Sequence, residues 1–340
     1  GLDDLLDHRI GLLAALIFAL ASFAAAELVR GVLSGRHRFA CYGRYFAVEG
    51  GSRLVFAVVL AVVGVRSVGA YAVTLAGAFA LAAFVSLGSE RPFVRPGPEA
   101  GYRELTPALG LLLVASLGEA FTLNVGPVAL DLIAPEGIGE DAPGVLLDGL
   151  IISRIPLFFF QAVKASLLPS LAALAGSDEL HRFRDVQLRI VAAVLGLAAS
   201  AVAVSAAVGP WLVETLFGDQ LGSRDMALLA ASGGGLMVQL SLGLGLVALG
   251  HTRLAVVGWV VAVASFPFVI QLADEPFLRV ELAMVASVVL GSLVTGGLLG
   301  LRYEAHVAEG RVAPATSADP GDRHGATADS GPVDGGSAGA

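Results

Sequence analysis

The sequence predicts an all-α protein, a polytopic bundle of about nine transmembrane helices. Its 340 residues are 56% hydrophobic and only 15% charged. The mean hydropathy of +0.80 lies far above the balance found in soluble domains. Apolar segments long enough to cross the hydrocarbon core of a bilayer also recur along the whole chain. We therefore expect most of the chain to lie in a membrane.

Composition also excludes several function classes. The single cysteine, Cys41, excludes a disulfide framework within the chain and any metal site built from several cysteines. The six histidines show no spacing typical of metal ligands, so no metal and no other cofactor is expected. The net charge of −8 is carried mostly by loops and the C-terminal tail, and no basic patch is interleaved with aromatic residues. Nucleic acid is therefore not an expected partner.

The N-terminal part of the chain contains three predicted spans, at residues 10–28, 45–65 and 67–87. Three aspartates stand in the first seven residues, where a secretory signal peptide would need basic residues. The first apolar segment is therefore predicted to be a transmembrane helix. A compact basic turn is predicted at residues 30–39.

The C-terminal part contains six more predicted spans, at residues 105–133, 146–172, 190–211, 226–249, 254–272 and 280–301. Residues 178–189 are predicted to be a loop. We expect three domains: residues 1–104 with three helices, residues 105–302 with six, and a disordered cytoplasmic tail at 303–340, where Gly, Ala, Ser, Pro and Asp show no periodicity. Gly296 and Gly300 have the spacing that lets two helices approach closely.

The predicted span at residues 146–172 organises the chain, because it carries Arg154, Gln161 and Lys164 inside an apolar run. As one helix it would be about 40 Å long, more than the roughly 30 Å hydrocarbon core. Arg154 and Gln161, seven residues apart, would share one helix face. A cation at membrane depth costs about 2.5 to 3.5 kcal/mol, so both cations are expected to face a bundle interior or a wet cavity.

Two interpretations of these cations stay open. They line an anion-binding wall, or they snorkel to opposite membrane interfaces. Pro156 and Pro169 each remove a backbone donor and predict kinks in the helix.

Other polar residues fall inside predicted spans. Glu49 and Arg53 lie four residues apart in the order that favours an intrahelical ion pair. Glu119, Asn124 and Asp131 all lie in the predicted span at residues 105–133. Charged groups at this depth are candidates for coupling or for charge balance, although structural ion pairs are as common.

Orientation follows from the distribution of Lys and Arg among the loops. Alternate loops are rich in arginine: Arg30, Arg36, Arg38 and Arg44; Arg91, Arg95 and Arg103; Arg182, Arg184 and Arg189; Arg253; and Arg302. The opposite loops contain only Arg9, Arg66, Arg224 and Arg279. The acidic loop at 135–141 is therefore expected outside, and the tail in the cytoplasm.

An internal repeat is suggested by a shift of 215 residues. Residues 32–38 (VLSGRHR) then align with residues 247–253 (VALGHTR), matching at Val, Gly and Arg in two turns expected to be cytoplasmic. If spans one to three correspond to spans seven to nine, three helices preceding Gly1 would complete a repeat of six plus six. We therefore expect an N-terminally truncated chain, although a chance match is about as probable.

Three segments together resemble polysaccharide flippases of the multidrug/oligosaccharidyl-lipid/polysaccharide (MOP) exporter superfamily. They are residues 30–39 (RGVLSGRHRF), the LTPALGLLLVASLGEAFTLNVG segment with Asn124, and residues 152–157 (ISRIPL) followed by LLPSLA. The resemblance covers about residues 10–300 and is spread over many weak positions. It implies two six-helix lobes, of which one is complete here, and alternating access around a cation-lined cavity onto which Arg154 and Lys164 map.

The resemblance implies a flippase for an undecaprenyl-pyrophosphate-linked oligosaccharide in the plasma membrane. Arg154 and Lys164 would bind the pyrophosphate, and Gln161 and Asn124 the sugar hydroxyls. Glu119, Asp131, Glu49 and Arg53 are candidates for coupling or charge balance. Expected partners are membrane lipids, the polysaccharide polymerase and glycosyltransferases.

Three alternatives stay open. A multidrug antiporter of the same fold would favour an acidic cavity. A membrane enzyme would need an acid/base constellation on a long external loop, which the sequence lacks, so no enzymatic activity is expected. A non-transporting membrane scaffold is compatible with a truncated chain.

The predicted orientation is testable at Cys41. Because the arginine-rich loop containing it is expected in the cytoplasm, a membrane-impermeant maleimide should label Cys41 only after permeabilisation. Labelling in intact cells would overturn the orientation.

Overall fold

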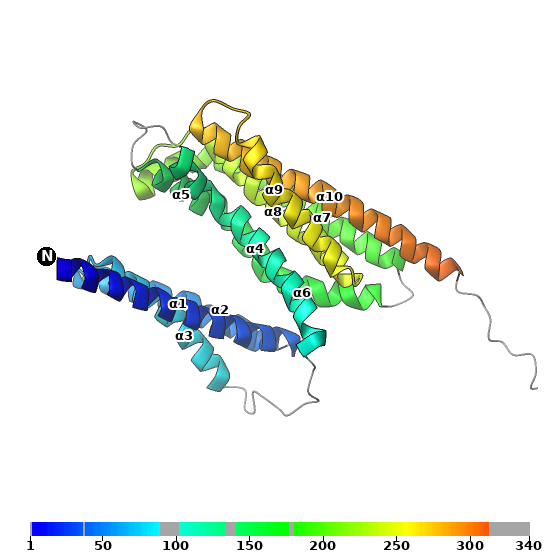
Figure 1. Ribbon diagram of the computed structural model, residues 1–340, viewed down its shortest axis with the longest axis horizontal. Helices are drawn as coiled ribbons and strands as arrows, with labels where there is room; N and C mark the ends of the chain where they lie inside the picture. The colour runs from blue at the N-terminus through cyan, green and yellow to red at the C-terminus, as the bar shows by residue number, and fades with distance from the viewer. Residues whose placement is uncertain (1, 37, 89–101, 134–140, 177–179, 313–340) are drawn as a thin grey trace, which may run out of the picture. The chain divides into compact units, whose positions relative to one another are not determined.

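The computed structural model describes residues 2–36, 38–88, 102–133, 141–176 and 180–312, and the only regular secondary structure in this part of the chain is α-helix (Figure 1). Eight of its helices are long and apolar enough to cross a membrane, and a bent pair counted as one span makes nine. The prediction of an all-α bundle with about nine spans is thus confirmed. The chain divides into two compact units, residues Gly1–Gly101 and Tyr102–Ala340.

The N-terminal unit consists of α1 (Leu2–Gly35), α2 (Phe39–Val63) and α3 (Val68–Gly88). Helix α3 packs against both of the others. The predicted ion pair between Glu49 and Arg53 is confirmed, and Arg53 also lies over the ring of Phe79, 4.4 Å from its centroid. An acid on one side and an aromatic face on the other compensate a cation held away from water.

The C-terminal unit contains seven helices: α4 (Tyr102–Ile133), α5 (Ala142–Ser153), α6 (Ile155–Ala175), α7 (Leu180–Phe217), α8 (Ser223–Ala248), α9 (Thr252–Val269) and α10 (Pro276–Val312). Helix α8 packs against α5, α6, α7, α9 and α10, and is the most buried candidate span. Helix α10 packs against α4, α8 and α9, and runs alongside α8 and α9 in Figure 1. These two helices form the centre of the unit.

Glycines set the distances between the central helices. A Cβ atom added to Gly234 of α8 would lie 2.6 Å from Cβ of Ala198 on α7, and one added to Gly235 would lie 2.3 Å from Val288 on α10. Between α9 and α10, a Cβ on Gly291 would lie 2.9 Å from the carbonyl oxygen of Gly258. Small residues let the backbones approach this closely, which supplies packing energy where lipid gives no hydrophobic drive.

The expected close approach at Gly296 and Gly300 does not occur within the C-terminal unit. A Cβ on Gly296 would meet only Leu242, at an ordinary 3.5 Å, and one on Gly300 would meet nothing within 4 Å. Spacing alone did not identify the pair of glycines that faces a neighbouring helix.

A buried polar contact crosses the centre of the C-terminal unit. Gln239 of α8 donates from Nε2 to Oγ1 of Thr295 on α10 at 3.0 Å, and Thr295 donates to the Gly291 carbonyl at 2.8 Å. Both side chains are at most 1% exposed. A Cβ on Gly258 of α9 would lie 1.9 Å from Thr295 Oγ1 and 2.7 Å from Gln239 Nε2. The polar pair therefore occupies the space that the missing side chain leaves.

The expected single helix at residues 146–172 is wrong. The chain breaks at Arg154, and the axes of α5 and the first part of α6 differ by 52°. Pro156 stands in the first turn of α6, where its missing N–H costs nothing, and its ring disfavours the α conformation in the residue before it. The chain therefore does not kink at Pro156 within one helix but begins a new helix after Arg154, two residues earlier.

Three other predicted boundaries are wrong. Helix α1 extends to Gly35, so the basic turn between α1 and α2 is shorter than residues 30–39. Helix α7 begins at Leu180, inside the predicted loop at 178–189, because residues 180–189 contain no glycine or proline. Helix α10 extends to Val312, so residues 303–312 of the predicted tail are helical; they are rich in Ala and Glu, which favour helix. The rest of the predicted tail lies outside the described residues.

The two segments of the suggested repeat occupy corresponding places. One joins the end of α1 to the start of α2, and the other joins the end of α8 to the start of α9. In both trios, α1–α3 and α8–α10, the third helix packs closely against the first two, which contact each other much less. The local arrangement is therefore similar in the two trios.

We predict that Gly258→Ala destabilises the protein by about 1 to 3 kcal/mol, because the new methyl group overpacks the contact between Gln239 and Thr295. The melting temperature of the purified protein in detergent measures the effect. Adding Thr295→Ala, which removes the nearest atom, should restore part of the loss.

Gly297→Ala on α10 is the matched control, since a Cβ there would meet nothing within 4 Å and alanine favours helix. An equal melting temperature for Gly258→Ala and the parent would contradict the packing argument.

Candidate functional site

Arg154 occupies the break between α5 and α6. Its N–H donates to the Leu150 carbonyl at 3.1 Å and its carbonyl accepts from Phe158 at 3.2 Å, so the backbone stays satisfied through the bend. The side chain is half-buried beside α8, where a Cβ on Gly233 would lie 3.9 Å from its Cγ. Among the described residues, nothing forms a hydrogen bond or ion pair with its guanidinium.

Arg154 lies deep in the membrane, so the lack of a partner for its charge is energetically unfavourable. Twelve residues of α5 precede it, which at 1.5 Å per residue place it about 18 Å along a span whose hydrocarbon core is roughly 30 Å thick. A cation near the middle of a membrane is expensive unless a partner, water or a ligand compensates it. Arg154 therefore remains a candidate for an anion-binding group.

Lys164 is in a different situation. Its Nζ lies 3.5 Å from Oε2 of Glu119 on α4, and Gln161 Nε2 donates to Oε1 of the same carboxylate at 3.0 Å. The side chains of Lys164 and Glu119 are only 27% and 23% exposed. The three residues form a charge-neutral cluster that joins α4 to α6, and this ion pair is one of the interpretations left open for Glu119.

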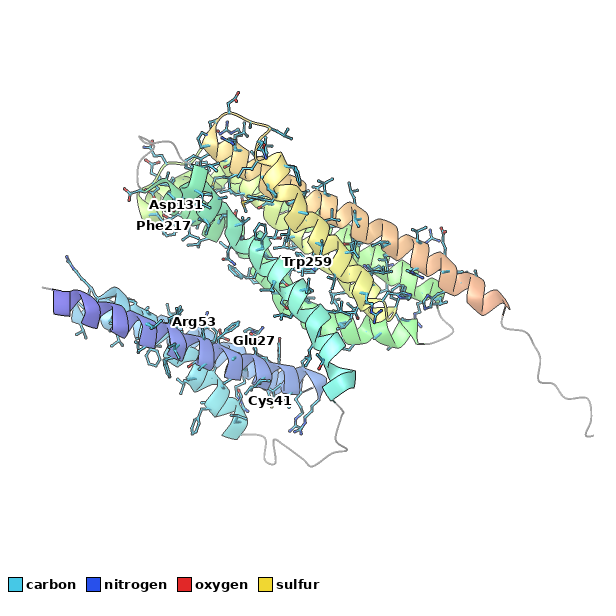
Figure 2. All side chains as sticks on the ribbon, viewed as in Figure 1. Glu27, Cys41, Arg53, Asp131, Phe217 and Trp259 are labelled. Atoms are coloured by element: carbon cyan, nitrogen blue, oxygen red, sulfur yellow. The ribbon has the colours of Figure 1, made fainter. Side chains whose placement is uncertain are left out.

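The other predicted residues do not join these groups. Asn124 is exposed, and its Nδ2 donates to the Ala120 carbonyl of its own helix at 2.8 Å. Asp131 is exposed, two turns further along α4 on the same face, and Figure 2 shows it near the end of that helix. Because of the bend, Arg154 does not share a continuous helix face with Gln161. Glu49 and Arg53 belong to the N-terminal unit.

A small apolar cavity of about 250 Å³ lies beside the break. Ile152, Ile155 and Pro156 form one wall, and α7 forms the other, with Ser200 and Ser205 as its polar members. Its lining suits a hydrocarbon chain better than a sugar.

Sequence reasoning missed two acidic groups. Glu281 of α10 is fully buried, and neither carboxylate oxygen has a hydrogen-bond partner among the described residues. Asp148 of α5 lies close to Asp219, which follows α7, so two carboxyl groups face each other there. Glu281 and Asp148 could have been singled out from the sequence, because each is a carboxylate inside a predicted span.

Comparison with known proteins identifies the fold. No family model matches the sequence. The chain is 27% identical over 301 residues to uncharacterized proteins of Mycobacterium bovis and Mycobacterium tuberculosis, a match that covers 84% of this chain and 64% of each relative. The chain thus spans somewhat less than two thirds of the length of these relatives.

Among solved structures, the chain is similar to a MATE protein in the bent conformation, with a TM-score of 0.65 and 14% identity over 89% of this chain and 70% of the other. It is also similar to an outward-facing multidrug resistance MATE family transporter of the MOP superfamily, with a TM-score of 0.63 and 11% identity over 88% and 77%. The chain therefore has the fold of MATE transporters. At these identities the similarity shows the fold alone.

The cluster of Glu119, Gln161 and Lys164 generates a double-mutant test. Lys164→Met leaves a partly buried carboxylate without its cation, and Glu119→Gln leaves a partly buried cation without its acid, so each should destabilise the protein. The double variant should lose less than the sum of the two, by roughly 1 kcal/mol.

Unfolding of the purified variants in detergent measures this coupling. Asn124→Ala, a change on the same helix that touches only a local bond, should be additive with Lys164→Met. Additivity of Glu119→Gln with Lys164→Met would instead show that the ion pair contributes nothing to stability.

Proposed function

We propose that this chain transports an undecaprenyl-pyrophosphate-linked oligosaccharide from the inner to the outer leaflet of the plasma membrane. Its fold supports membrane transport, since its structural neighbours are transporters. The observation that supports an anionic substrate is Arg154, a half-buried guanidinium at a helix break, unpaired within the described residues.

The electrostatic argument rests on what an unpaired cation needs. A partly dehydrated guanidinium gains most from an anion that it binds through two parallel N–H groups, and a phosphate group offers that geometry. The pyrophosphate would thus replace the hydration that Arg154 loses on insertion. A hydrocarbon chain attached to the same substrate fits the apolar lining of the cavity beside the break.

Lys164 is the second cation that we propose for the pyrophosphate, and it can bind only if it leaves its acidic partner. It already has an acidic partner in Glu119, so a pyrophosphate has to compete with that carboxylate. A pyrophosphate that displaces the Glu119 carboxylate would bind Lys164 and leave Gln161 free to bond sugar hydroxyls. The cluster is therefore our candidate for coupling or charge balance, with Asn124 and Asp131 on another side of α4 as secondary candidates.

A multidrug antiporter is the second candidate function. The solved structures that resemble this chain include a multidrug resistance transporter, and Glu119 neutralises one of the two cations that argued against this function. A cationic drug would be attracted by exposed acids such as Asp131 and repelled by Arg154. The two candidates therefore make opposite predictions for Arg154.

We predict that Arg154→Ala abolishes glycan export while the variant inserts normally. Removing a cation at this depth relieves a cost of about 2.5 to 3.5 kcal/mol, so the membrane level of the variant should not fall. Arg154→Lys should retain partial activity, because a point charge keeps the attraction but loses the two-pronged geometry. Surface glycan in cells that carry only the variant measures export.

Arg66→Ala, in the exposed turn between α2 and α3, is the matched control for the change in net charge, and should export normally. Lys164→Ala should reduce export less than Arg154→Ala does, because Lys164 is shared with Glu119. Parental export by Arg154→Ala at normal protein levels would reject the anion mechanism. A gain in efflux of lipophilic cationic dyes by the same variant would favour the multidrug function.

A further inference from the structure

A cationic cavity, separate from the apolar one beside Arg154, lies where α8 ends and α9 begins. Its volume is about 710 Å³, within the range of ligand pockets. Arg253 of α9 and Arg302 of α10 both line it, together with the turn around His251. Neither arginine belongs to the proposed transport site.

The charge in this cavity is not balanced. Among the residues that the structure describes, none that lines it is acidic. The side chains of Arg253 and Arg302 are exposed and have no ion-pair or hydrogen-bond partner in the described part of the chain. Two cations that share one cavity without an acid repel each other, and an anion between them removes that repulsion.

The start of α9 adds to the positive potential. His251 at its N-cap makes no side-chain capping bond, and the first turn contains no acid. Thr252, Arg253 and Leu254, the first three residues of the helix, all line the cavity. The helix dipole therefore points its positive end toward the same space.

The remaining wall is apolar. Leu111 and Leu112 of α4 and Leu168 of α6 line the cavity, and Leu112 is 50% exposed. These leucines belong to segments whose composition suits the hydrocarbon core. A soluble anion would gain nothing from contact with this apolar surface. An anionic lipid, in contrast, binds cations through its headgroup and an apolar surface through its acyl chain.

We infer that this cavity binds an anionic phospholipid of the leaflet on this side, which the arginine distribution predicts to be the cytoplasmic one. The phosphate lies between Arg253 and Arg302, and an acyl chain lies along Leu111, Leu112 and Leu168. The lipid fills the junction of α4, α6, α8, α9 and α10. This inference does not depend on which substrate the protein transports.

Native mass spectrometry of the purified protein tests it, with phosphatidylglycerol and phosphatidylcholine of identical acyl chains as probes. The parent should bind phosphatidylglycerol more tightly. Arg253→Ala and Arg302→Ala should each weaken that binding roughly fivefold, since one cation near an anionic lipid is worth about 1 kcal/mol. Binding of phosphatidylcholine should change little. Leu112→Trp, which fills the apolar wall without changing charge, should weaken both lipids.

Arg44→Ala is the matched control, because Arg44 is an exposed arginine predicted on the same membrane side but belongs to α2. It should bind phosphatidylglycerol as the parent does. Equal losses for Arg44→Ala and Arg253→Ala would overturn the site in favour of general surface charge. Displacement of phosphatidylglycerol by millimolar inorganic phosphate, with no effect of Leu112→Trp, would assign the cavity to a soluble anion instead. Parental affinity in the double arginine variant would also reject the inference.

Discussion

The compensation of polar groups away from water is the constraint on which this structure depends. In lipid no solvent replaces a missing partner, so each charged or amide side chain within a span needs one from a neighbouring helix. Glu119 obtains two from α6, and Gln239 obtains Thr295 from α10. In the N-terminal unit, Arg30 and Arg53 each combine a glutamate with an aromatic ring (Figure 2 labels Glu27 and Arg53). Arg154 and Glu281 are therefore notable because the described residues leave them uncompensated.

The same constraint explains where the C-terminal unit is most tightly packed. Partners on different helices meet only if the backbones are close, and glycines at 234, 235, 258 and 291 provide that closeness. The polar pair of Gln239 and Thr295 lies where Gly258 opens space for it. Close packing and polar compensation thus occur at the same level of the bundle, around α8 and α10.

The sequence predicted the parts of the fold that depend on composition. Hydropathy located every span to within a few residues at most ends, and four-residue spacing predicted the pair of Glu49 and Arg53 correctly. It failed where the outcome depends on a neighbour. The break at Arg154 moved the arginine away from the face of Gln161, and Glu119 took Lys164 as its partner across 45 residues of sequence. Nothing local in the sequence specifies which glycine faces which helix, so Gly258 and Gly291 were not singled out.

The position of the third helix in each trio has a consequence for biosynthesis. Helices enter the membrane in the order in which the ribosome makes them, and α1 and α2, like α8 and α9, contact each other only weakly. Until α3 or α10 is made, the first two helices of a trio lack the surface that holds them together. Polar side chains on α8, such as Gln239, meanwhile lack their hydrogen-bond partner, which lies more than 50 residues downstream. Each trio can therefore complete its internal packing only when its last helix arrives, although α8 already packs against α5, α6 and α7 by then.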